Sequence, residues 1–224
     1  MVELPASGRL HDVNEMSQFR SAVIEQASGF ISALDDVHAI DVRCAVLVEG
    51  VSDEAAIRTL AVRRNRDLDA ERVCVVPIGG ATNIRRYLEL LGPPGLGVRL
   101  AGLCDVGEER HFQRAADRTG LVSSPDRSAM ESLGFFVCDA DLEDELIRSL
   151  GTPAVEAVIE ELGDLDALRT FQNQPAQRDR SIERQLRRFM GTLSGRKERY
   201  AGSLAKALDP DRVPRPLALL LEHL

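Results

Sequence analysis

The 224-residue sequence lacks the features that mark several common classes of protein. It has no apolar run long enough to span a bilayer, and its first sixteen residues contain no signal-peptide core, so we expect a cytoplasmic protein without membrane attachment. No two of its four cysteines form a C-x-x-C pair, which argues against a zinc site and favours buried, reduced side chains. Its four histidines form no metal-binding pattern, and no serine or cysteine has a paired base for nucleophilic catalysis.

Charge is distributed unevenly along the chain. The formal net charge of −8 argues against a protein that coats nucleic acid with its whole surface. Residues 139–166 contain ten acids and one base, whereas residues 175–200 contain eight bases and three acids. A metal-dependent phosphodiester enzyme needs an acidic site beside a basic surface, but charged runs are also commonly solvated helix faces. The candidate nucleic-acid contacts in the basic stretch are Arg178, Arg184, Arg188, Arg196 and Arg199.

The most informative local pattern is the segment AVLVEGVSDEAAI at residues 45–57. Its apolar run is typical of a buried parallel strand and ends at Glu49, after which Gly50 permits a tight turn. Ser52 is the predicted N-cap of the next helix, which places Asp53 in the first helical turn. Because open α/β sheets carry their sites at the C-terminal ends of strands, Glu49 and Asp53 are candidate site residues. Asp53 could equally serve only the helix dipole.

Two further apolar runs end in a carboxylate. Residues 98–104 lead to Asp105, with Glu108 close behind, and residues 134–138 lead to Asp139, with more acids in residues 141–145. Carboxylates that three strands deliver to one edge of a sheet repel one another unless cations neutralise them. Hard oxygen ligands of this kind suit Mg²⁺ or Mn²⁺. The sequence therefore predicts a divalent-metal site at this edge.

Strand-like and helix-like segments alternate between residues 41 and 150. We expect strands at about 43–48, 72–77, 98–104 and 134–138, and helices at about 53–65, after the glycine pair to about residue 91, at 108–118 and at 141–150. This rhythm predicts an α/β fold with a parallel sheet of about four strands and helices on both faces. In the N-terminal segment, residues 1–40, we expect poor order over residues 1–14 and one amphipathic helix over residues 18–34.

Strand signals stop after residue 150. Helical patterns follow at 153–162, 164–172, 180–191, 196–208 and 214–223, separated by glycine and proline. We therefore expect three parts: the N-terminal segment at 1–40, a sheet domain at 41–150, and a helical C-terminal appendage at 151–224 that packs against the sheet domain.

Several motifs, taken in order, resemble the topoisomerase–primase (TOPRIM) catalytic fold, and most closely the TOPRIM nuclease domain of the overcoming-lysogenisation-defect (OLD) family. They are VEGVSDE at residues 48–54, VPIGG at 76–80, Asp105 after the third strand, FFVCDADLEDEL at 135–146 and the lysine segment SGRKERYA at 194–201. The resemblance covers roughly residues 41–224.

The resemblance implies a Mg²⁺- or Mn²⁺-dependent endonuclease acting on nucleic acid, with DNA rather than RNA as the expected substrate. One metal would lower the pKa of an attacking water, and the other would stabilise the leaving oxygen. The implied catalytic residues are Glu49, Asp105 and Lys197, of which Lys197 would hold a phosphate oxygen and stabilise transition-state charge. The implied metal ligands are Glu49, Asp53, Asp105, Glu108, Asp141 and Glu143.

Two features depart from the family pattern. The family has Asp-x-Asp after the third strand, whereas this chain has Asp105-Val106-Gly107, so that Glu108 or Glu109 would have to replace the second acid. The chain also has no G-x-x-x-x-G-K-[S/T] phosphate loop, which suggests a stand-alone TOPRIM protein or one with a separately encoded ATPase. Two other functions stay open: nucleotidyl transfer with Glu49 as general acid/base, and a catalytically weakened module that binds nucleic acid or an ATPase partner.

Overall fold

The protein is built on a four-stranded parallel sheet, described here from a computed structural model over residues 6–29, 40–191 and 196–224. The strands are β1 (Cys44–Val48), β2 (Val73–Pro77), β3 (Arg99–Asp105) and β4 (Phe135–Cys138), in the order β2-β1-β3-β4. All three pairings are parallel, so the C-terminal ends of the strands lie along one edge. The predicted fold class, a parallel sheet with helices and a helical C-terminal part, is confirmed.

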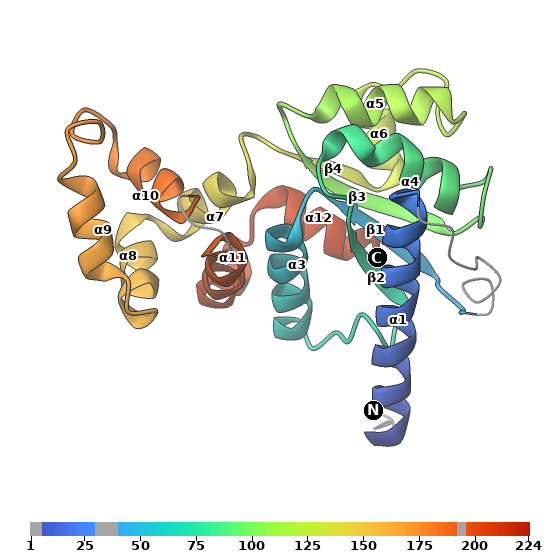
Figure 1. The fold of residues 1–224 in the computed structure, drawn as a ribbon, viewed down its shortest axis with the longest axis horizontal. Helices are drawn as coiled ribbons and strands as arrows, with labels where there is room; N and C mark the ends of the chain where they lie inside the picture. Colours follow the sequence, from blue (N-terminus) through green and yellow to red (C-terminus); the bar gives the residue numbers. More distant parts are fainter. Residues whose placement is uncertain (1–5, 30–39, 192–195) are drawn as a thin grey trace.

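Helices cover both faces of the sheet (Figure 1). One face carries α1 (Ala6–Ala27), α4 (Ile84–Leu91), α5 (Glu109–Arg118) and α6 (Arg127–Leu133), and the other carries α3 (Val51–Arg63) and α12 (Arg215–His223). Side chains alternate across β1 accordingly: Ala45 and Leu47 join the core under α4, whereas Val46 and Val48 join the core under α3. Because both faces are covered, every residue of β1 is buried and apolar.

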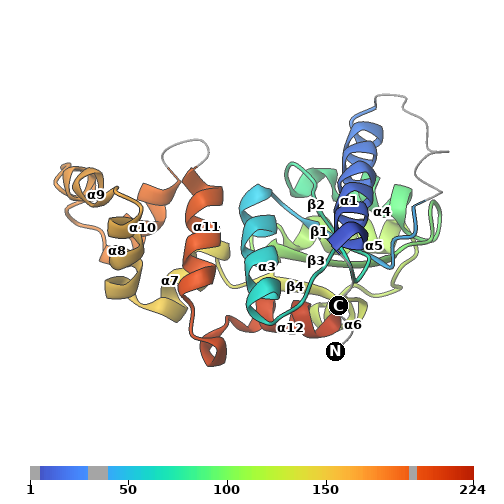
Figure 2. The same cartoon turned by 90° about the horizontal axis from the view of Figure 1, so that it is seen from below.

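The remaining helices form an extension beside the sheet. Helices α7 (Leu142–Leu150), α8 (Thr152–Glu161), α9 (Leu165–Gln172) and α10 (Ile182–Met190) lie to one side of it (Figures 1 and 2). Helix α11 (Arg196–Ala207) then returns and packs along α3, and α12 runs beneath β3 and β4. One continuous apolar core joins these helices to the sheet. The C-terminal region therefore packs tightly against the helix that follows Glu49.

Two local expectations from the sequence are wrong. Helix α1 begins at Ala6, so much of the stretch expected to be poorly ordered is helical; the last part of the predicted helix, residues 30–34, lies outside the described residues. The second half of α1 packs on the sheet core through Met16, Phe19 and Val23. Ser52 is not the N-cap of α3: Gly50 is, and the helix begins at Val51, two residues earlier than expected.

No helix within residues 6–29, 40–191 and 196–224 is long and apolar enough to cross a membrane.

Candidate active site

Two strands place the first pair of carboxylates. Asp105 is the last residue of β3, and Glu49 directly follows β1, its neighbour in the sheet. The Oε1 atom of Glu49 accepts the backbone N–H of Asp105 at 3.1 Å, which fixes one carboxylate against the base of the other. Both residues line a cleft of about 420 Å³ at the C-terminal edge of the sheet. The predicted convergence of strand-end acids is therefore seen for these two residues.

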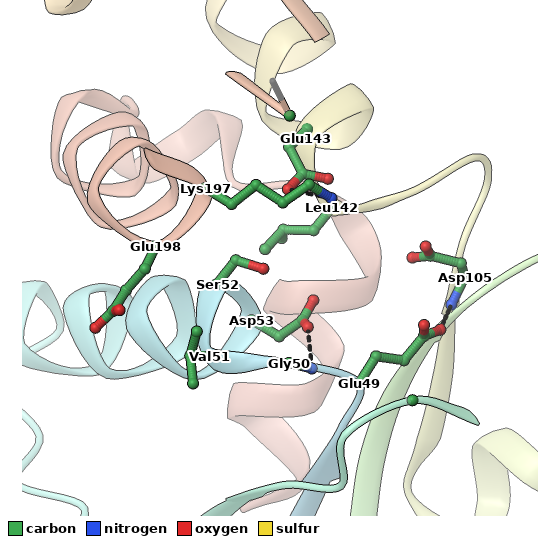
Figure 3. A pocket seen from close by; sticks show the side chains of 12 residues that line it. Glu49, Gly50, Val51, Ser52, Asp53, Asp105, Leu142, Glu143, Lys197 and Glu198 are labelled. Carbon is green, nitrogen blue, oxygen red and sulfur yellow. Dashed lines mark hydrogen bonds and ion pairs between the residues drawn. The ribbon is translucent and has the colours of Figure 1, made fainter. Parts of the chain in front are cut away.

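The first turn of α3 adds a third carboxylate. Gly50, in extended conformation, is the N-cap of α3, and the side chain of Asp53 accepts the Gly50 N–H at 2.9 Å. This half of a capping box, in which the third helical residue accepts the N-cap N–H, satisfies a backbone donor that the helix leaves without an internal partner. Asp53 is only 9% exposed and faces the same cleft (Figure 3). A single turn thus carries Glu49 and Asp53 into one site.

The helical extension supplies a fourth carboxylate and a lysine. Glu143, in the first turn of α7, is 4% exposed, and the ammonium group of Lys197 on α11 lies 3.4 Å from its Oε1 atom (Figure 3). This contact is an ion pair without hydrogen-bond geometry, so Glu143 Oε1 is buried without a hydrogen-bond partner among the described residues. A buried carboxylate oxygen in this state has unused capacity to bind a cation. Ser52 and Glu198 also line the cleft.

Burial and mutual repulsion disfavour the ionised form of the carboxylates in the cleft. Burial, followed by the negative charge of Glu49, raises the pKa of Asp105 to about 8. Burial also raises the pKa of Asp53 to about 7, with Glu143 and Glu49 adding to the rise while the Gly50 N–H opposes it. Desolvation raises the pKa of Glu49 as well. The ionised carboxylates therefore destabilise one another, and a proton or a cation in the cleft relieves that strain.

The donor set fits a divalent cation, although the side chains are not arranged around one. Among the described residues, no three histidine, cysteine, aspartate or glutamate side chains are grouped closely enough to hold an ion. Three of the four carboxylates have another contact instead: Glu49 takes a backbone N–H of β3, Asp53 that of Gly50, and Glu143 the Lys197 ammonium. Carboxylate oxygens are the ligands that Mg²⁺ and Mn²⁺ prefer, and Glu143 Oε1 has no hydrogen-bond partner among the described residues.

Two other predicted metal ligands, Asp141 and Glu108, lie outside the cleft lining. Asp141 caps α7 by accepting the Asp144 N–H at 2.8 Å, and its second oxygen accepts a hydrogen bond from Arg187 at 2.6 Å. Glu108 lies 3.6 Å from His111 at the start of α5. Neither residue lines the cleft, and their roles as metal ligands stay predictions.

The second acid of the family's Asp-x-Asp pattern is a glycine here, Gly107. A β-carbon at that position would meet open space, since no atom beyond its chain neighbours lies within 4 Å. The two expected replacements, Glu108 and Glu109, do not line the cleft, and Glu109 is paired with Arg127 at 2.7 Å. Replacement of the second acid by either residue stays a prediction.

The predicted nucleic-acid contacts divide into two groups. Arg184 and Arg188 are exposed on α10, and Arg178 is exposed beside it, with its Nε donating to the Asn173 carbonyl. Arg196 and Arg199 instead turn toward the loop between α8 and α9: Arg196 pairs with Asp164 at 3.4 Å, and Arg199 donates to the Leu162 carbonyl. Sequence reasoning missed Asp164 because its partners lie more than thirty residues away and no local pattern marks it.

The comparisons with known proteins agree with this geometry. The family model of the overcoming lysogenization defect protein-like TOPRIM domain matches residues 42–106, which contain Glu49, Asp53 and Asp105. No curated protein sequence matches the chain. Among solved structures, the C-terminal region of the Burkholderia pseudomallei OLD protein shares the fold at 24% identity, with a TM-score of 0.63, over 82% of this chain and 96% of that one.

A second solved structure is more similar in sequence. The C-terminal region of the Xanthomonas campestris pv. campestris OLD protein is 30% identical, with a TM-score of 0.64. The match covers 81% of this chain and 93% of that one, so it extends beyond the sheet into the helical region. The family resemblance of the sequence motifs is thereby confirmed, and the chain belongs to the OLD family of TOPRIM-domain proteins.

Proposed function

We propose that this protein hydrolyses phosphodiester bonds of nucleic acid, with DNA as the expected substrate, in a reaction that requires Mg²⁺ or Mn²⁺. One observation carries the proposal: carboxylates from two strand ends, a helix start and the helical extension share one cleft with a lysine. Such a cleft binds cations through its carboxylates and presents an ammonium group to an anionic substrate. Membership of a family with nuclease members supports the same conclusion.

The residues that would hold the cations are Glu49, Asp53, Asp105 and Glu143. When bound, a divalent cation lowers the pKa of an attacking water and neutralises charge on the leaving oxygen. The backbone N–H of Asp105 holds the Glu49 carboxylate at the sheet edge, and Asp105 is itself the last residue of β3, so both acids project from the same edge. Their raised pKa values mean that the ionised, cation-binding form is favoured by alkaline rather than acidic conditions.

Lys197 is placed to act on the substrate. Its side chain is 54% exposed, while its ammonium group reaches the buried Glu143 oxygen at 3.4 Å. A phosphate oxygen entering the cleft would offer the ammonium group a stronger, hydrogen-bonded partner than this ion pair. We therefore assign Lys197 the role of holding the phosphate and stabilising the charge that develops in the transition state.

The exposed arginines of α10, Arg184 and Arg188, would contact the nucleic-acid backbone beyond the cleft. Both lie on α10, and Gly191 at the C-terminal end of that helix lines the cleft, so this basic face adjoins the cleft. A separately encoded ATPase partner stays a prediction from the family resemblance.

The loss at Gly107 favours one rival, a module that binds nucleic acid but cleaves it weakly. A cleavage assay separates the two. Purified protein is incubated with plasmid DNA and with single-stranded DNA and RNA, in Mg²⁺, Mn²⁺ or EDTA. We expect cleavage that EDTA abolishes and that falls by about a hundredfold or more in Glu49→Gln, Asp105→Asn and Lys197→Ala.

The control is Asp126→Asn, because Asp126 is an exposed N-cap on α6, away from the cleft. It should cleave at the wild-type rate. If folded protein that binds DNA cleaves no nucleic acid with any divalent metal, the hydrolase proposal is wrong and the binding module takes its place.

A further inference from the structure

One half-buried carboxylate outside the cleft, that of Asp164, receives three side chains from the start of α11. Asp164 lies just before α9, and its Oδ2 atom accepts the hydroxyl of Tyr200 at 2.6 Å. Its Oδ1 atom lies 3.4 Å from the guanidinium of Arg196, and Oδ2 lies 3.8 Å from that of Arg199. No other acid in the described ranges gathers three partners from this helix. The cluster therefore joins the loop between α8 and α9 to one particular turn.

That turn also carries Lys197. Residues 196, 199 and 200 fall on one side of the helix by their spacing, and residue 197 lies about 100° around the helix from residue 196. Lys197 extends into the cleft toward Glu143 (Figure 3), while Arg196, Arg199 and Tyr200 contact Asp164. The guanidinium of Arg196 also stacks over the Phe189 ring, 4.9 Å from its centre. The start of α11 is thus held by side chains on a different face of the helix from Lys197.

The contacts of Asp164 include a hydrogen bond to a buried side chain as well as ion pairs. Tyr200 is fully buried, so its hydroxyl needs an acceptor, and Asp164 provides one. Asp164 thereby ties the end of α11 that carries Lys197 to the loop between α8 and α9.

We propose that Asp164 is a positioning residue that fixes the Lys197 ammonium over the carboxylate cleft through Arg196 and Tyr200. The inference rests on the proposed function only in giving Lys197 a part in phosphodiester hydrolysis. Under this proposal Arg196 and Arg199 bind Asp164 and hold α11 in place, instead of contacting nucleic acid as their charge suggests.

The composition of the chain allows a direct test that needs no enzymatic activity. The sequence contains two lysines, Lys197 and Lys206, and both lie on α11. Amine-reactive labelling of the full chain, followed by mass spectrometry of the two sites, therefore gives the reactivity of Lys197 with Lys206 as an internal reference on the same helix. In wild type, the ion pair with Glu143 should slow labelling of Lys197 relative to the exposed Lys206.

Three variants and one control form the series. Asp164→Ala removes every contact, Asp164→Asn keeps an acceptor for Tyr200 but loses the charge, and Tyr200→Phe removes only the hydroxyl. The control, Glu156→Ala, breaks a two-point ion pair with Arg169 that joins α8 to α9 without involving Asp164 or Tyr200. We expect the labelling ratio of Lys197 to Lys206 to rise at least threefold in Asp164→Ala, less in Asp164→Asn, and not at all in the control.

The kinetic arm separates positioning from general destabilisation. Asp164→Ala should lower kcat by about tenfold or more and change KM less than twofold, since a small misplacement of a catalytic group mainly affects the chemical step. Asp164→Asn should recover part of kcat. In the Lys197→Ala background, adding Asp164→Ala should lower kcat no further, because the two residues act as one unit.

An unchanged labelling ratio in folded Asp164→Ala overturns the proposal, and so does full additivity of the two kcat losses. If wild type cleaves nothing while the labelling ratio still rises in Asp164→Ala, the proposed function fails but the positioning of Lys197 by Asp164 stands. Should Asp164→Ala not fold, Asp164→Asn and Tyr200→Phe decide by the same labelling ratio.

Discussion

Replacing Asp53 with asparagine should stabilise the cation-free protein at pH 8. Asparagine keeps an oxygen that can accept the Gly50 N–H, which Asp53 accepts at 2.9 Å, but it removes a charge that is buried beside other carboxylates. The rise in the Asp53 pKa from 3.8 to about 7 corresponds to roughly 4 kcal/mol against the ionised form. Glu49 and Glu143 take part in the same repulsion and relax when one charge is removed. We therefore expect Asp53→Asn to raise the free energy of unfolding by about 1–2 kcal/mol rather than the full amount.

The pH dependence has a definite sign. The folded state raises the pKa, so the penalty is absent below the unfolded value near pH 4, grows as the pH rises, and is complete above about pH 7. The gain from Asp53→Asn should therefore be larger at pH 8 than at pH 5. For a chain of this size, about 1–2 kcal/mol corresponds to a rise in Tm of about 3–6 °C.

The assay is thermal unfolding in EDTA at both pH values. Asp126→Asn is the matched control, because Asp126 caps α6 by accepting the Ala129 N–H at 2.8 Å on an exposed surface. Asparagine and aspartate are equivalent caps, so its Tm should stay within a degree or two of wild type at both pH values. If Asp53→Asn lowered the Tm at pH 8, the carboxylate would be serving the helix dipole, and the reasoning would be refuted.

Three further outcomes follow from the site. Millimolar Mn²⁺ should raise the Tm of wild type, and the rise should shrink in Glu49→Gln, since a cation that binds only the folded protein stabilises it; equal shifts in both proteins would contradict a cleft site. Gly107→Asp should increase Mn²⁺-dependent cleavage several-fold, because it restores the second acid of the Asp-x-Asp pattern. The position accepts a side chain, since it has open space and no left-handed backbone. An unchanged rate across a manganese titration would show that the second acid is dispensable. Arg184→Ala and Arg188→Ala should each weaken DNA binding and reduce its salt slope by about one, whereas Arg169→Ala, which breaks a pair with Glu156, should not; unchanged slopes would exclude α10 as a contact.

Local pattern was enough to predict the sheet and half of the site. The four strands lie within a residue or so of their expected positions, because each is a short, continuous apolar run that only a buried strand explains. The rule that sites lie at the C-terminal ends of parallel strands placed Glu49 and Asp105 together without any coordinates. The start of α3 was missed by two residues because glycine and serine are both acceptable caps.

The remainder depends on contacts between distant segments. Asp139 follows β4 as expected, but its side chain is 72% exposed and pairs with Arg148, so strand-end position alone does not bring an acid into the cleft. Asp141 and Glu143 are two residues apart, yet Arg187 engages the first and the second faces Lys197. The packing of helices α10 and α11 determines which of the two acids faces the cleft. No pattern in the acidic segments of the sequence indicates how those helices pack.

The same limit explains the basic residues. A run of arginines looks uniform in sequence, yet Arg196 faces Asp164 whereas Arg188 faces solvent. Helical spacing can assign two residues to different faces, but it cannot tell which face meets a buried partner.

The most direct test of the account is a crystal structure of the protein soaked in Mn²⁺, with anomalous diffraction used to locate the ion. The account predicts an anomalous peak in the cleft, with oxygens of Glu49 and Asp105 at a coordination distance of about 2.0–2.2 Å. Asp53 or Glu143 should supply a further ligand. A cleft that stays free of anomalous density at saturating Mn²⁺, with the four carboxylates in their present contacts, would contradict the account.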